Sequence, residues 1–159
     1  MSGENVLLCG STQASIDNVL IRILNDSRFS EIVSPVRIGS EENIYDEEIR
    51  PYTLAAQKRQ LKGALELTSD EAEGLILSSS NLTCGTMEGI LSHPWIRESR
   101  IEAKENEGRD SFVHKSPQPH WDTLIIDECS KTTFNEFIVP AMYCRRFILV
   151  GDIRQLPPY

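Results

Sequence analysis

Two acidic residues, Asp127 and Glu128, directly follow the apolar run 123–126, and their chemistry suits a phosphate-handling site. A carboxylate at a strand end can hold Mg²⁺, usually through water, because Mg²⁺ favours carboxylate together with phosphate oxygens. An adjacent glutamate can then orient or deprotonate an attacking water. Taken by itself, the pair can also be no more than a solvated acidic turn.

A second polar group, in residues 151–158, follows the apolar run 147–150. Gly151 permits a sharp turn at a strand end. Asp152 and Gln155 would then lie near the first acidic pair, because the carboxyl ends of parallel strands share one edge of a sheet. Gln155 carries both donor and acceptor groups, so it can contact a γ-phosphate and a water together. The alternative is a proline-closed loop without a chemical role.

The elements that would position these residues alternate between apolar runs and helical patterns. Apolar runs that we interpret as buried strands lie at 6–9, 75–77, 123–126 and 147–150, with a short extended stretch around 32–38. Apolar residues at helical spacing lie within 15–24, 52–67 and 134–142. This alternation predicts an α/β fold with a parallel sheet flanked by helices.

Two stretches lack this periodicity. Residues 86–120 combine glycines, prolines and a charged patch, and we interpret them as an irregular insertion or loop. Residues 41–48 carry five acidic side chains in eight positions, which favours a solvated surface. We therefore expect a single domain over residues 1–159.

Composition narrows the possible partners. The 159 residues carry a net charge of −8, so a general basic surface for nucleic acid is absent, and any contact must be local. No apolar run is long enough to cross a bilayer, so we expect no membrane partner. The four cysteines are scattered without metal-ligand spacing, which favours reduced thiols and a cytoplasmic or nuclear location.

The polar motifs resemble those of superfamily 1 helicases. Residues 127–131 (DECSK) resemble motif II, the Walker B box, and residues 151–158 (GDIRQLPP) resemble motif III. Residues 6–17 are similar to motif Ia in the style of the nonsense-mediated-decay helicase, and 75–85 resemble the next strand and its Ser/Thr-rich loop. The resemblance covers nearly the whole chain, weakly over 86–120. It implies an incomplete RecA-like P-loop NTPase domain.

The resemblance also implies roles for individual residues. Asp127 would coordinate Mg²⁺ and Glu128 would be the catalytic base, with Mg²⁺ and ATP as cofactors of the complete domain. Asp152 and Gln155 would bind the nucleotide, and Gln155 would also act in catalysis by sensing the γ-phosphate. The residues that would contact single-stranded DNA or RNA are Ser11, Thr12, Gln13, Ser79, Ser80, Asn81 and Thr83. For Ser11 to Gln13, a helix cap is an equally good explanation.

One family motif is missing: this sequence contains no G-x-x-x-x-G-K-[ST] phosphate-binding loop. In the family that loop precedes motif Ia, so we expect a piece of a longer motor domain that is inactive alone. Its partners would be the segment with the P-loop and a second RecA-like domain. Losing the P-loop strand should leave the strand at 147–150 with an unpaired edge, which a dimer could cover. The alternatives are a stand-alone remnant that binds nucleic acid or protein, and an ATPase completed in trans.

Overall fold

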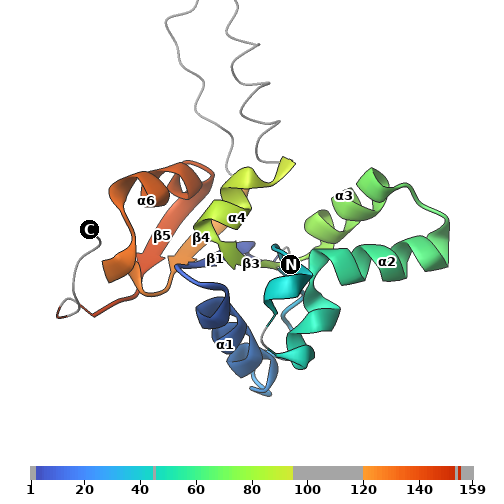
Figure 1. Ribbon diagram of the computed structural model, residues 1–159, viewed down its shortest axis with the longest axis horizontal. Helices are drawn as coiled ribbons and strands as arrows, with labels where there is room; N and C mark the ends of the chain where they lie inside the picture. The colour runs from blue at the N-terminus through green and yellow to red at the C-terminus, as the bar shows by residue number, and fades with distance from the viewer. Residues whose placement is uncertain (1–2, 45, 95–119, 153, 155–159) are drawn as a thin grey trace, which may run out of the picture.

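A computed structural model describes residues 3–44, 46–94, 120–152 and 154 of the chain. Its centre is one five-stranded sheet with the order β2-β3-β1-β4-β5, in which every neighbouring pair is parallel (Figure 1). The strands are β1 (Val6–Gly10), β2 (Pro35–Arg37), β3 (Leu82–Thr86), β4 (Trp121–Ile126) and β5 (Cys144–Leu149). This arrangement confirms the predicted α/β fold with a parallel sheet flanked by helices.

Each described α-helix directly follows a threonine, which fixes where the chain turns from loop to helix. They are α1 (Gln13–Leu24), α2 (Leu54–Leu65), α3 (Ser69–Ser79), α4 (Met87–Ser92) and α6 (Phe134–Ala141). In each case the hydroxyl of the preceding threonine accepts a bond from a backbone N–H of the first turn. In α3 and α6 a glutamate three residues later bonds back to that threonine, completing a capping box.

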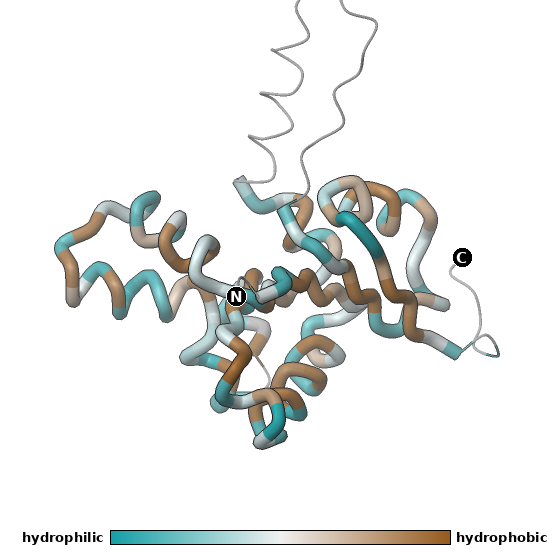
Figure 2. The backbone as a smooth tube through the Cα atoms, turned by 180° about the vertical axis from the view of Figure 1, so that it is seen from behind, coloured by the Kyte–Doolittle hydropathy of each residue, from teal (hydrophilic) through white to brown (hydrophobic). Residues whose placement is uncertain are grey.

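The sheet has a hydrophobic core on each face, because consecutive strand residues point to opposite sides. Leu7 and Leu124 face a cluster that includes residues of α3, α4 and α6. Leu8 faces a second cluster formed with α1 and the 3-10 helix at Glu47–Tyr52. Figure 2 shows the hydrophobic residues concentrated along the strands, whereas α2 and α3 mix hydrophobic and hydrophilic positions. Helices therefore cover both faces of the sheet.

The register places several strand ends at a single edge. Gly10 of β1 pairs with Thr86 of β3, and Ile126 at the end of β4 pairs with both Cys9 and Leu149. The residues that follow these strands therefore emerge together at what we call the carboxyl edge. Since ligands of open parallel sheets bind at this edge, it is where a site is expected.

Two sequence interpretations are corrected. The run 75–77 is not a strand, because it lies inside α3, where Ile76 packs into the core while Leu75 is 48% exposed. The missing strand is β3, which begins five residues after Leu77. Residues 86–92 are not irregular either, because Thr86 ends β3 and α4 follows directly. Most of the remaining predicted insertion, 95–119, lies outside the described residues.

β5 is an edge strand of the described sheet, as the sequence predicted. It pairs with β4 on one side, and Phe147 contacts Phe137 of α6 with ring centroids 5.0 Å apart. Even so, residues 147–150 remain 48–55% exposed. Elsewhere in the described chain, no helix is both long and apolar enough to cross a membrane.

Candidate functional site

The acidic pair lies at the carboxyl edge, on the turn that follows β4. The Asp127 backbone N–H donates to Cys9 O at 2.9 Å, which ties the turn to the end of β1. Asp127 Oδ1 accepts the Glu128 N–H at 3.0 Å. Glu128 has a φ of 54°, a left-handed conformation that is uncommon for a residue with a side chain. The two carboxylates are therefore held on a tight, constrained turn at the end of an interior strand.

The second polar strand end packs directly against this turn. The Cys129 N–H donates to Val150 O at 2.9 Å. A Cβ added at Gly151 would lie 2.8 Å from Cys129 Sγ and 3.1 Å from Ser130 N, so only glycine fits there. Asp152 follows at once, and its Oδ1 accepts the Arg154 N–H at 2.9 Å. The structure thus brings Asp152 to the same edge as the acidic pair, while Gln155 lies outside the described residues.

Glu128 is the most connected side chain of the site. Its Oε2 accepts a hydrogen bond from Ser11 Oγ at 3.0 Å and another from Lys131 Nζ at 3.2 Å. The Ser11 hydroxyl, and then Lys131, hold the pKa of the Glu128 carboxyl below its usual value. Glu128 is therefore a carboxylate at neutral pH, a form that can accept a hydrogen bond from water. The Ser11 contact also joins this carboxylate to the turn that precedes α1.

That turn, formed by Ser11 and Thr12 with Gln13, is where sequence reasoning placed a nucleic-acid contact. Thr12 Oγ1 accepts the Ser15 N–H at 3.2 Å, so Thr12 caps α1. Ser11 and Thr12 are both exposed, and they line a hollow of about 430 Å³ together with Gln13, Thr86 and Lys131. The turn is a helix cap and also lies open at the carboxyl edge.

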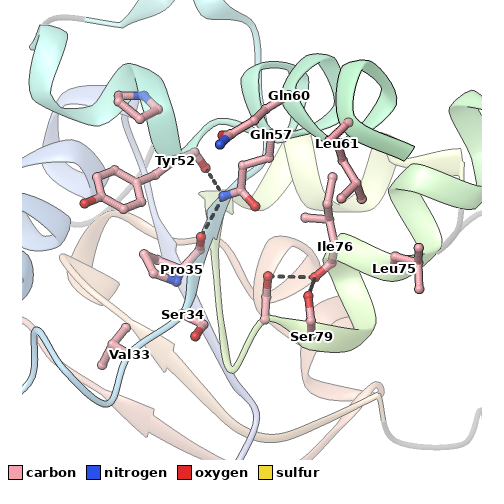
Figure 3. Close-up of a pocket in the computed structure, with 13 residues that line it drawn as sticks. Val33, Ser34, Pro35, Tyr52, Gln57, Gln60, Leu61, Leu75, Ile76 and Ser79 are labelled. Atoms are coloured by element: carbon pink, nitrogen blue, oxygen red, sulfur yellow. Dashed lines mark hydrogen bonds between the residues drawn. The ribbon is translucent and has the colours of Figure 1, made fainter. Parts of the chain in front are cut away.

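The other four predicted nucleic-acid residues lie elsewhere. Ser79 and Ser80 end α3, and each hydroxyl donates to Ile76 O (Figure 3). Asn81 precedes β3, where its side chain bonds backbone groups of the segment before β2. Thr83 is 3% exposed and accepts the Trp121 Nε1–H at 3.1 Å. None of these residues lies with Ser11: the first three are at the amino end of β3, and Thr83 is inside it.

The residues around Asp127 fit Mg²⁺ bound to a nucleotide. One or two carboxylates suffice for Mg²⁺ when phosphate oxygens and waters supply the remaining ligands. The described residues contain no cluster of three or more side chains that would hold a metal without them. Beside the acidic pair, the buried hydroxyls of Ser130 and Thr132 have no hydrogen-bond partner among the residues that the structure describes. Unsatisfied buried hydroxyls are rare in folded proteins, and here they are consistent with a site that a further component completes.

Sequence reasoning missed the buried support behind the 11–13 turn. Arg37 is fully buried and Asp17 is 2% exposed, and Arg37 Nε donates to Asp17 Oδ1 at 2.9 Å. Gly39, with a φ of 143°, lies against both Arg37 and the Gln13 side chain. An arginine inside an extended apolar stretch, four residues before an acidic segment, is the only feature of the sequence that could have indicated this pair.

Helices on both faces of a parallel sheet, with an acidic pair at the carboxyl end of an interior strand, are typical of nucleotide-binding α/β domains, P-loop NTPases among them. The profile of the AAA domain family matches residues 50–159, which is more than half of the chain. The chain therefore belongs to this family.

Curated relatives extend the match to superfamily 1 helicases. The chain is 23% identical to the DNA replication ATP-dependent helicase/nuclease DNA2 of Saccharomyces cerevisiae, over 98% of this chain and 8% of the relative. It is 27% identical to helicase sen1 of Schizosaccharomyces pombe, over 75% of this chain and 6% of that protein. It is 25% identical to the probable helicase MAGATAMA 3 of Arabidopsis thaliana, over 96% of this chain and 18% of that protein. The chain is thus related to their motor domains and spans under a fifth of these relatives.

Proposed function

We propose that this chain is part of the motor domain of an ATP-dependent superfamily 1 helicase or translocase that acts on single-stranded DNA or RNA. The observation that carries the proposal is the packing of two polar strand ends against each other. Asp127 and Glu128 lie on one, and Gly151 and Asp152 lie on the other. The yeast relative is itself named an ATP-dependent helicase.

In this proposal Asp127 would hold Mg²⁺, and the ion would supply positive charge to balance the ATP phosphates. Glu128 is ionised and constrained, so it can orient and deprotonate the attacking water. Asp152 and Gln155 contact the nucleotide from the neighbouring strand end. Because Cys129 and Gly151 are in contact, a shift at one strand end would be transmitted to the other.

The nucleic-acid contact is assigned to the turn of Ser11, Thr12 and Gln13. Backbone amides and hydroxyls at a helix start suit phosphate oxygens, and they position a strand without reading its sequence. Ser11 also bonds Glu128, so strand binding and the hydrolytic carboxylate share one hydrogen bond. This arrangement supports coupling between the two events, for either DNA or RNA.

The exposed edge of β5 supports a missing neighbour. The apolar residues 147–150, three at the end of β5 and one directly after it, are typical of a strand buried on both faces in a parallel sheet, yet about half of each is exposed. We assign this edge to the remainder of the motor domain, including the segment with the P-loop. A second RecA-like domain would complete the nucleotide site from the other side.

The first experiment is the mass of the native polypeptide that contains this sequence. A polypeptide several times 18.0 kDa is expected, because the relatives are far longer than this chain. In that polypeptide, nucleic-acid-stimulated ATP hydrolysis should fall about a hundredfold or more in Glu128→Gln, as for loss of a general base. Glu31→Gln, at an exposed position near the amino end of β3, is the matched control and should keep its turnover.

Either of two results contradicts the proposal: full turnover in Glu128→Gln, or ATP hydrolysis by the 159-residue chain alone that Glu128→Gln abolishes. A native mass near 18 kDa favours the second candidate function, a stand-alone module that binds nucleic acid or protein without hydrolysis. The observation that favours this candidate is the lack of a P-loop motif in the sequence.

A further inference from the structure

A second hollow, of about 540 Å³, lies between α2, α4 and the residues that follow β2. Its titratable lining consists of Lys58, Arg59, Lys62 and His93, and none of the described residues that line it is a carboxylate. This is unusual in a chain whose net charge is −8. The hollow therefore concentrates positive charge that the composition as a whole does not suggest.

Neighbouring carboxylates hold two of these cations in place. Glu73 of α3 pairs with Lys58, and Glu41 accepts two bonds from the Arg59 guanidinium at 2.7 and 2.9 Å. Neither glutamate lines the hollow. Lys62 has no ion pair within the described chain, so it is the cation most available to a ligand.

His93 supplies an independent observation. The ring is 8% exposed, and its Nε2 lies 3.3 Å from Glu73 Oε1. Its other nitrogen, Nδ1, is buried and has no hydrogen-bond partner among the described residues. An unpaired buried nitrogen in a polar hollow indicates a partner that the described part of the chain does not supply.

This hollow adjoins the 11–13 turn at the carboxyl edge. Gly39 lines the hollow, and a Cβ added there would lie 3.3 Å from Nε2 of Gln13, which lines the hollow at the turn. The two hollows also share α4, with Glu88 lining one and Gly89 the other. A chain of phosphates passing Ser11 could therefore continue to Lys62 along a single surface.

We propose that the basic hollow binds backbone phosphate of the same single strand that contacts the 11–13 turn. This inference rests on the proposed function and adds a second contact point for the nucleic acid. Two contact points define the path of the nucleic-acid strand across α4. Lysine and arginine at a solvated rim attract phosphate without reading sequence. The hydroxyl and amide turn holds the strand at one end and the cations hold it at the other.

The test is the affinity of the 159-residue chain for a fluorescent 20-nucleotide oligothymidylate, measured by anisotropy across a salt series. Lys62→Ala should weaken binding about two- to fivefold and reduce the slope of log affinity against log salt by about 0.7. The charge-matched control is Arg22→Ala, on the last turn of α1, which should change neither quantity. Thr12→Ala reports on the 11–13 turn separately.

The outcomes separate this inference from the proposed function. If Thr12→Ala weakens binding and Lys62→Ala does not, the hollow is not a phosphate site and the turn remains one. The inference is also overturned if a poly-glutamate peptide competes as well as the oligonucleotide does. The His93→Gln variant assigns the NMR signals of the His93 ring. If the hollow instead binds free phosphate, these signals should shift with 10 mM inorganic phosphate as much as with the oligonucleotide. Movement with the oligonucleotide alone is the expected result.

Discussion

At the scale of single residues, the site depends on a few side chains that each hold two parts of the molecule together. Ser11 belongs to the turn before α1, yet its hydroxyl bonds Glu128 on the turn after β4. The buried pair of Arg37 and Asp17 lies behind the same turn. Neither link joins neighbours in the sequence, which is why both became visible only in the folded chain.

The Ser11 bond can be tested by titrating Glu128. Ser11→Ala should raise the pKa of the Glu128 carboxyl toward its ordinary 4.5, because the largest cause of its lowering is removed. Lys131 remains, so the pKa should stay somewhat below that value. The measurement is a carboxylate ¹³C NMR titration. Glu71, whose low pKa comes from Thr68, is the internal control and should not move.

The lowered pKa of Glu128 also determines how the stability of the fold changes with pH. A carboxyl with a lowered pKa stabilises the folded state above its unfolded pKa, and that contribution is lost as pH falls through the folded pKa. In acid, the wild type should therefore lose more stability than Ser11→Ala does. A Glu128 pKa that is identical in both proteins would show that the bond does not form in solution.

The buried pair predicts a large loss of stability. Asp17→Asn leaves the Arg37 guanidinium, which is fully buried, without a compensating charge. Breaking such a pair from one side costs about 3–5 kcal/mol of unfolding free energy. Urea denaturation measures it, with Asp26→Asn in the exposed pair with Arg28 as control, expected to change stability far less than Asp17→Asn does. Equal effects of the two substitutions would contradict the role assigned to burial.

At the scale of elements, the strands and helices that were predicted correctly have a long hydrophobic pattern or are followed by a recognisable polar motif. The strands at 6–9, 123–126 and 147–150 lie within or overlap β1, β4 and β5, and the helix at 15–24 lies within α1. The run 75–77 failed because three apolar residues fit a buried strand and a helix equally well. The capping box of Thr68 and Glu71 was the available indication that a helix begins there.

That single error explains the part of the predicted site that the structure does not assemble. With a strand placed at 75–77, the polar residues after it would emerge at the carboxyl edge beside Ser11. Because 75–77 is helical, Ser79 and Asn81 instead lie before β3, at the opposite edge. The strands before the acidic pair and Asp152 were predicted at the right positions. Because a residue that directly follows a parallel strand lies at the carboxyl edge, these three residues were also expected at the correct edge.

The junction between the two polar strand ends predicts a strict requirement for glycine. Gly151→Ala would force its Cβ to 2.8 Å from Cys129 Sγ and close to backbone nitrogens, so the turn must move. Overpacking of this kind costs about 1–3 kcal/mol. The control is Gly63→Ala, in the middle of α2 with nothing within 4 Å, which should stabilise by up to about 1 kcal/mol. Chemical denaturation of both variants would distinguish them, and a neutral Gly151→Ala would contradict the close packing.

At the scale of the whole molecule, the two ends of the sheet differ. β2 is short and its three residues are buried, whereas β5 has no second neighbouring strand among the described residues and presents apolar side chains. An exposed apolar edge strand is a template for pairing with another chain. The same edge that we assign to the rest of the motor domain should therefore make the 159-residue chain associate with itself.

Sedimentation velocity of the isolated chain over a range of concentrations tests this expectation. The wild type should shift toward dimer as concentration rises, and Ile148→Lys should weaken association about tenfold or more, because a charge on an edge strand opposes pairing and loses apolar burial. Leu75→Lys on α3 is the matched control, since Leu75 and Ile148 are 48% and 49% exposed. A wild-type chain that stays monomeric at high concentration would show that the β5 edge is stable in water. If Leu75→Lys also abolishes the dimer, the contact lies at the α2–α3 hairpin and not at the sheet edge.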